Sequence, residues 1–246
     1  MRVQLFVTCL VDLAYPEVGE RTVALLERLG CEVRFPAGQT CCGQPALNSG
    51  HPHAAQRVAR AFLDAFAATD GPIVAPFGSC VHMVRHAHGR LVGDDPRAAA
   101  VGERVVDLPT FVVRDLGRDD VGGRYPLADG AEPVPVAWHD ECHLLRGLGA
   151  AGAARRLLGG VQGCRVVPVE RADLCCGFGG TFAVKVPKVS AAMADEKLDR
   201  ALAAGARAIV STDPGCLMHL EGRARRRGLD LRVHHLVDLL EPEGRL

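Results

Sequence analysis

Two pairs of adjacent cysteines, each followed by glycine, are the most chemically distinctive residues of this chain. The pairs are Cys41-Cys42-Gly43 and Cys175-Cys176-Gly177. The chain has 10 cysteines among 246 residues. In a cytosolic protein, thiols are kept reduced, so this number favours metal or redox chemistry over disulfides.

The other cysteines show that the two pairs belong to a repeat. Cysteines of the first half recur in the second half at intervals of 133 to 136 residues. We interpret this spacing as an internal duplication of roughly 110–120 residues. The matching cysteines are Cys9 and Cys142, Cys31 and Cys164, Cys41 and Cys175, and Cys80 and Cys216.

The elements around the cysteines predict an α/β protein with two repeated domains, residues 1–117 and 134–246. Residues 118–133, rich in Gly, Asp and Pro, are the expected linker. Short apolar runs such as Val3 to Thr8 predict strands, and amphipathic segments such as Pro16 to Leu29 predict helices. Strands that alternate with helices imply mainly parallel sheets, whose sites lie at the carboxyl ends of the strands.

Each copy brings four cysteines to this predicted edge, in three separate loops. Thiolate is a soft ligand that favours zinc, copper(I) or iron–sulfur clusters. We therefore predict one cysteine cage in each half. The first set is Cys9, Cys41, Cys42 and Cys80, and the second is Cys142, Cys175, Cys176 and Cys216.

The vicinal arrangement favours an iron–sulfur cluster over a single zinc ion. Structural zinc sites usually use Cys-x-x-Cys, which the sequence lacks. Adjacent side chains tend to point apart, and a cluster of several irons spreads its ligand positions more widely. The glycine after each pair permits a positive φ and lets backbone amides approach the cluster. Zinc and metal-free redox thiols remain alternatives, and we interpret Cys31 and Cys164 as buried structural residues.

Three ionisable residues near the second pair are candidates for catalysis. His139 and His143 flank the cage residue Cys142, and either is a candidate base for the hydroxyl proton of a 2-hydroxy acid. Lys185 is a candidate partner for a substrate carboxylate or an anionic cluster. The alternative is that the histidines only support the ligand loop or face solvent, and that Lys185 is a solvated surface lysine.

Composition excludes several other classes of function. The formal net charge is zero, which gives no basic excess for nucleic acid and no polybasic tail for a membrane surface. We find neither a signal peptide nor an apolar run of the ~18 residues that a membrane span needs, so we expect a cytoplasmic protein. The sequence also lacks the Gly-x-Gly-x-x-Gly fingerprint of dinucleotide-binding folds.

Three stretches resemble a known family, the cysteine-rich CCG domain family. It includes the cysteine-rich component of heterodisulfide reductase and the iron–sulfur subunits of anaerobic glycerol-3-phosphate and glycolate oxidases. The resemblance covers nearly the whole chain and is greatest to the subfamily of lactate utilization protein A, short stand-alone proteins with two such domains. The stretches are Gly78 to Met83, Cys175 to Lys185, and Gly215 to His219.

The resemblance implies a redox subunit that oxidises L-lactate, or a related 2-hydroxy acid, to pyruvate with partner proteins. The implied partners are a ferredoxin-like iron–sulfur subunit and a small third subunit. Met83 and His219 stand where the heterodisulfide reductase type has a further cysteine. We therefore expect a four-thiolate cluster of the 4Fe–4S type, one or two per chain, with His219 as an alternative fifth ligand. A heterodisulfide-reductase-like thiol–disulfide subunit and a zinc or cysteine scaffold module remain the alternative functions.

Overall fold

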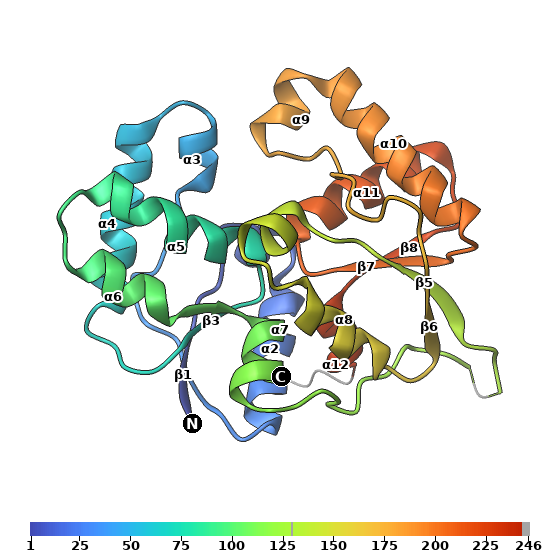
Figure 1. Cartoon of the computed structure of the whole chain (residues 1–246), viewed down its shortest axis with the longest axis horizontal. Helices are drawn as coiled ribbons and strands as arrows, with labels where there is room; N and C mark the ends of the chain where they lie inside the picture. The colour runs from blue at the N-terminus through green and yellow to red at the C-terminus, as the bar shows by residue number, and fades with distance from the viewer. Residues whose placement is uncertain (129, 243–246) are drawn as a thin grey trace.

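The computed structural model describes residues 1–128 and 130–242 and contains two four-stranded sheets (Figure 1). Every strand pair in both sheets is parallel, which confirms the predicted α/β class. The strand orders are β2-β1-β3-β4 and β6-β5-β7-β8. The strands are β1 (Arg2–Leu5), β2 (Glu32–Arg34), β3 (Ile73–Ala75), β4 (Val105–Asp107), β5 (Val134–Trp138), β6 (Cys164–Val167), β7 (Ala208–Ser211) and β8 (Arg232–His235).

The two sheets have the same connectivity, which confirms the duplication. In each sheet, the chain passes from the first strand (β1 or β5) to the edge strand beside it (β2 or β6). It then crosses to the strand on the opposite side of the first (β3 or β7). The register is also matched, since Val3 pairs with Val33 in one sheet and Val136 with Val166 in the other. The carboxyl ends of the two central strands form the crevice where such folds bind ligands.

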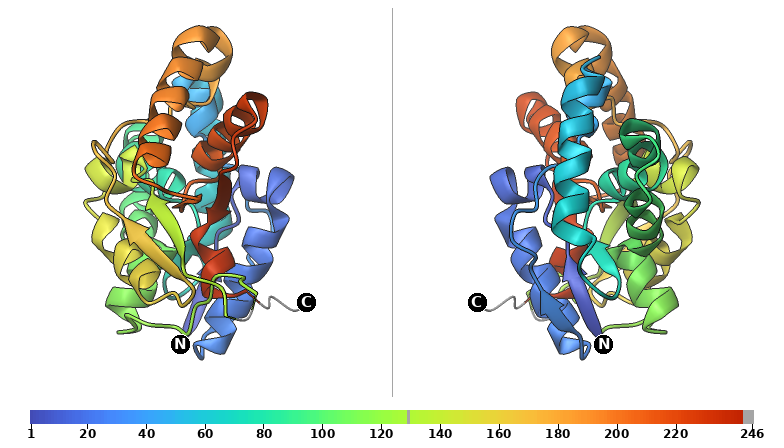
Figure 2. Two further views of the ribbon diagram at one scale, coloured as in Figure 1. Left: turned by 90° about the vertical axis from the view of Figure 1, so that its right-hand side faces the viewer. Right: turned by 90° about the vertical axis from the view of Figure 1, so that its left-hand side faces the viewer.

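The helices form two outer layers and one central layer. In the right panel of Figure 2, α4 of the first half faces the viewer. In the left panel, β6 of the second half faces the viewer. Among the helices of the described residues, none has the length and apolar character needed to cross a membrane. The helical segments are α1 (Cys9–Ala14), α2 (Pro16–Arg28), α3 (Gln44–Asn48), α4 (Pro52–Phe66), α5 (Gly78–Val92), α6 (Arg97–Arg104), α7 (Leu108–Thr110), the π-helical η1 (Phe111–Asp115) and η2 (His143–Gly147), α8 (Ala151–Gly159), α9 (Thr181–Lys185), α10 (Pro187–Ala203), α11 (Pro214–Arg227) and α12 (Leu236–Leu240).

A single apolar cluster joins the two halves. It takes Leu25 from α2 of the first half and Leu157 and Leu239 from α8 and α12 of the second. Arg28 of α2 also donates to the carbonyl oxygen of Leu240, at 2.8 Å. Separate outer clusters lie on the far face of each sheet, and these contain the buried cysteines of the predicted cages, Cys42 and Cys80 in one half and Cys176 and Cys216 in the other. The central cluster therefore fixes the relative position of the two cysteine sets.

The predicted linker packs along the second half. Tyr125 is fully buried, and its amide donates to the carbonyl oxygen of Gln162 at 2.8 Å. The boundaries at 1–117, 118–133 and 134–246 remain a prediction, and residues 129 and 243–246 of those ranges lie outside the described residues.

In each set, the cysteines outside the vicinal pair lie in the first turn of a helix, where the sequence predicted loops. Cys9 opens α1, and Cys80 is the third residue of α5. Cys216 is the third residue of α11, which begins at Pro214. The physical reason is the cap, because Asp213 accepts a hydrogen bond from the amide of Cys216 at 2.8 Å.

The two vicinal pairs lie in turns that need glycine at the next position. Gly43 and Gly177 have φ values of +88° and +86°. In both turns the glycine amide donates to the sulfur of the first cysteine of the pair, at 3.4 Å. A Cβ atom at Gly177 would lie 2.6 Å from the carbonyl oxygen of Ser190, whereas one at Gly43 would lie 3.3 Å from that of Ala55.

Leu157→Ala tests the shared core. We expect this variant to lower the free energy of unfolding by about 2–5 kcal/mol, because Leu157 is 1% exposed and the vacated volume lies between the halves. Leu13→Ala is the matched control, since Leu13 is 80% exposed, and should change it by no more than about 0.5 kcal/mol. Denaturant unfolding followed by circular dichroism measures both. Two separate transitions, only one of them shifted, would contradict a common core.

Gly177→Ala and Gly43→Ala compare the two turns. Both variants incur the left-handed backbone strain of about 1–2 kcal/mol. Gly177→Ala should destabilise the protein further, because the carbonyl group of Ser190 must move. Equal losses of unfolding free energy in the two variants, in the same assay, would contradict a cost from the contact between the new Cβ atom and the carbonyl oxygen of Ser190.

Candidate metal centre between the two halves

The first cysteine set converges at the carboxyl ends of β1, β2 and β3. The sulfur atoms of Cys9 and Cys41 are 3.5 Å apart. Cys42 and Cys80 are 1% and 3% exposed, and the thiol of Cys42 interacts with those of both Cys41 and Cys80. The structure thus brings together all four cysteines that the repeat singled out in this half.

The second set converges in the same way at the ends of β5, β6 and β7. The sulfur atoms of Cys176 and Cys216 are 2.8 Å apart, and the thiol of Cys142 interacts with that of Cys175. None of the cysteines forms a disulfide in the part of the chain described, so all eight thiols are available as ligands.

The first cysteine of each pair is stabilised as a thiolate. Hydrogen bonds from neighbouring thiols lower the pKa of Cys41 to about 3 and that of Cys175 to about 2. The same hydrogen bonds raise the pKa of Cys9 and Cys142, which act as the donors. Hydrogen bonds to neighbouring thiols, together with burial, raise the pKa of Cys42 and Cys176 well above the usual value, so binding of a whole set as thiolates requires a compensating cation at the same place.

Both sets face a single cavity of about 130 Å³. Its wall includes Gln44 of α3 and Thr181 of α9, the two short helices that rise on either side in Figure 1. The cysteines in this wall come from both halves of the chain: Cys9, Cys42, Cys80, Cys142, Cys175, Cys176 and Cys216.

A polar chain crosses between the halves along the cavity wall. The hydroxyl of Ser79 in α5 donates to the carboxylate of Asp213, which caps the helix of Cys216. Nδ1 of His143 lies 3.1 Å from the same hydroxyl oxygen, and its Nε2 lies 3.3 Å from Nε2 of Gln44. Since the Ser79 proton goes to Asp213, its oxygen accepts from Nδ1–H, and Nε2 of His143 remains the acceptor.

The three residues predicted for catalysis lie in different surroundings. His143 lines the cavity. His139 is 1% exposed and lies within 4.8 Å of the sulfurs of Cys176 and Cys216. Lys185 is exposed at the end of α9 and, within the described chain, is not part of the cavity wall. Nε2 of His219 lies 3.1 Å from the hydroxyl of Ser190, so this nitrogen has a hydrogen-bond partner of its own.

Several residues of the site were missed by the sequence analysis. Ser79, Asp213 and Gln44 come together only through the packing of the two halves. Lys197 is buried, and its Nζ donates to the carbonyl oxygens of Ala172 and Leu174 at 2.5 and 2.9 Å, which secures the loop before Cys175. Its one available signal was its rarity, since the chain has only three lysines.

The donors fit a soft metal centre. The structure supplies four converging thiols in each half and, beside the second set, a buried imidazole. Neither ring nitrogen of His139 has a hydrogen-bond partner among residues 1–128 and 130–242. A buried polar group without a partner is costly, and a metal ligand bond removes that cost.

Comparisons with known proteins agree with the repeat. A family model described as a cysteine-rich domain, CCG, matches residues 3–85 and 136–221. A hypothetical protein from Helicobacter pylori shares the fold with a TM-score of 0.64 at 9% identity. The match covers 97% of this chain and 48% of that one, so this chain spans about half the length of that protein.

Curated relatives match along nearly the full chain. A lactate utilization protein A of an Exiguobacterium species is 44% identical, covering 97% of this chain and 96% of the relative. The protein of the same name from Macrococcus caseolyticus is 43% identical, covering 98% and 96%. Lactate utilization protein A 1 of Bacillus cereus is 41% identical, covering 98% of each. The chain therefore belongs to the cysteine-rich CCG domain family, alongside the lactate utilization A proteins.

Proposed function

We propose that this protein is an iron–sulfur redox subunit that takes part in oxidising L-lactate, or a related 2-hydroxy acid, to pyruvate. The observation that carries the proposal is the cavity whose wall contains cysteines of both halves. Two electron-accepting centres that face one space suit a two-electron oxidation. The names and close similarity of the curated relatives support lactate as the substrate.

The proposed ligands are the two cysteine sets. Cys9, Cys41, Cys42 and Cys80 would hold one cluster, and Cys142, Cys175, Cys176 and Cys216 the other. When bound, such clusters supply one-electron acceptors, and the two electrons then leave through a partner iron–sulfur subunit. The ferredoxin-like subunit and the small third subunit expected from the family are part of this proposal.

Oxidation of a 2-hydroxy acid to the keto acid releases two electrons and two protons, one from the hydroxyl and one from the carbon that bears it. Within this chain, we assign the hydroxyl proton to His143. Its Nδ1–H is held by the Ser79 hydroxyl, which is itself fixed by Asp213 of the other half. Nε2 of His143 accepts a hydrogen bond from the side-chain amide of Gln44, which sets the orientation of the ring, and it becomes the base when the substrate hydroxyl replaces that contact. Burial removes His139 from the wall, so we assign it no proton transfer. Pairing of Lys185 with the substrate carboxylate remains a prediction.

Metal analysis of Cys176→Ser tests the cages. Wild-type protein purified and reconstituted without oxygen should contain iron and acid-labile sulfide. The variant should lose the iron and sulfide that the second half binds. Cys164→Ser is the matched control, because Cys164 belongs to the same repeat but lies outside the cage. Colourless wild-type protein with stoichiometric zinc would contradict the redox function. A Cys176→Ser variant with a full iron content would contradict the ligand set.

His143→Gln tests the proton acceptor. With partner subunits present, lactate-dependent dye reduction should fall by about 10²- to 10⁴-fold, because the variant lacks a base at the cavity wall. Its iron content should not change. His86→Gln is the control, since His86 is an exposed histidine of α5. Disulfide reduction by a protein that is inactive with lactate would instead favour the heterodisulfide-reductase-like function.

A further inference from the structure

The two metal centres differ at one position of the repeat. His139 follows β5 at the place where Phe6 follows β1, 133 residues earlier. Phe6 is fully buried in the outer apolar cluster and packs edge-on against Phe62, with ring centroids 4.8 Å apart. His139 is also buried, but it lies beside Cys176 and Cys216.

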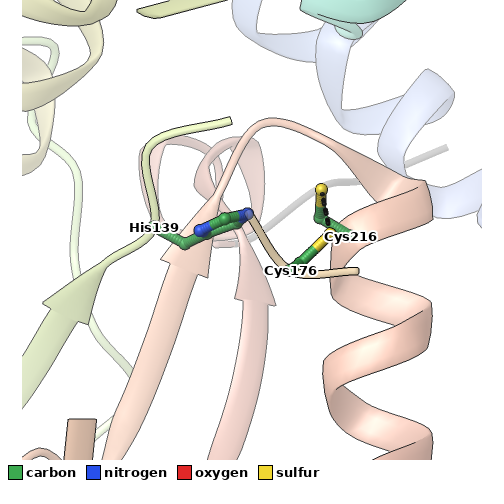
Figure 3. A group of neighbouring side chains, drawn as sticks. All are labelled: His139, Cys176 and Cys216. Carbon is green, nitrogen blue, oxygen red and sulfur yellow. Dashed lines mark hydrogen bonds between the residues drawn. The ribbon is translucent and has the colours of Figure 1, made fainter. Parts of the chain in front are cut away.

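The backbone of His139 is fixed by hydrogen bonds that leave the ring unpaired. Its amide donates to the carbonyl oxygen of Val210 at 2.9 Å, and its own carbonyl accepts from the hydroxyl of Ser211 at 3.0 Å. Figure 3 shows the ring extending from the end of β5 toward the two sulfurs. Within residues 1–128 and 130–242, both ring nitrogens lack a partner.

A buried lysine accompanies the histidine. Gly43 lies against the carbonyl group of Ala55 and Gly177 against that of Ser190, so these two residues are equivalent, at an offset of 135 positions. The same offset aligns Lys197 of α10 with Phe62 of α4. The aromatic pair of the first half is thus replaced by a histidine and a lysine in the second. Lys197 donates to two carbonyl oxygens, so it is not a partner for the imidazole.

We propose that His139 is a nitrogen ligand of the metal centre in the second half, and that the centre in the first half is held by sulfur alone. This inference rests on the proposed iron–sulfur function. A borderline metal such as iron accepts both thiolate and imidazole ligands. A neutral imidazole adds a ligand without adding negative charge, so a thiolate in its place would lower the reduction potential of the cluster.

Pulsed electron paramagnetic resonance on protein labelled with ¹⁵N-histidine tests the proposal. The reduced wild-type protein should show the hyperfine coupling of a directly bound imidazole nitrogen. His139→Phe, which installs the residue of the first half, should abolish this coupling. His143→Gln should retain it, although His143 lies 3.9 Å from the thiol of Cys142. Coupling that survives His139→Phe, or is absent from a wild-type protein with a full complement of iron and sulfide, would overturn the inference.

A second variant guards against a folding defect in His139→Phe. His139→Cys supplies a soft ligand at the same place, so it should keep the metal, lose the nitrogen coupling and lower the reduction potential of one centre. An unchanged potential in a fully loaded protein would count against ligation.

If the wild-type protein binds no iron or sulfide, the proposed function fails, and cobalt(II) becomes the probe of the site. Nitrogen coupling to cobalt that is lost in His139→Phe would support ligation by His139. Coupling that is absent from the wild type, or kept in the variant, would overturn it.

Discussion

The need to neutralise buried negative charge is the constraint on which the rest of this structure depends. Eight thiols converge in two groups at one end of two sheets, and hydrogen bonds to neighbouring thiols together with burial raise the pKa of Cys42 and Cys176 well above the usual value. In each half, one thiolate is supported by hydrogen bonds from its neighbours and from a glycine amide. Thiols in this arrangement are stable as ligands only when a cation joins them. The helix starts at Cys80 and Cys216 add partial positive charge from their first turns.

Much of the fold and the composition of the candidate site could be predicted from the sequence. The cysteine intervals identified two copies, and short apolar runs placed the strands, because buried parallel strands leave a continuous apolar pattern. The position of Cys9 at the start of a helix was not predicted, since α1 has only six residues and a weak pattern. Likewise, the position of Cys216 in the first turn of α11 was not predicted, because the cap of this helix, Asp213, was not recognised.

The polar chain through Ser79, Asp213 and His143 could not be predicted. Its members are far apart in sequence and meet only because a shared apolar core docks one half against the other. The burial of His139 is similar. Its sequence neighbours, Asp140 and Glu141, suggest a polar loop, yet the chain folds back against β7 and encloses all three. Burial raises the pKa of Glu141 well above its usual value. In both cases tertiary packing decided which polar groups face the cavity.

The packing of α12 against α2 has a consequence for how the protein is made. The first residue of α12 follows the last residue of α2 by 208 positions, yet both helices belong to the central apolar cluster. While the ribosome is still adding the second half, the apolar face of α2 has no completed partner surface. The first half must therefore remain soluble with part of its core exposed, which is a period of exposure to aggregation and chaperone binding. The cavity between the halves also takes shape only after this late step.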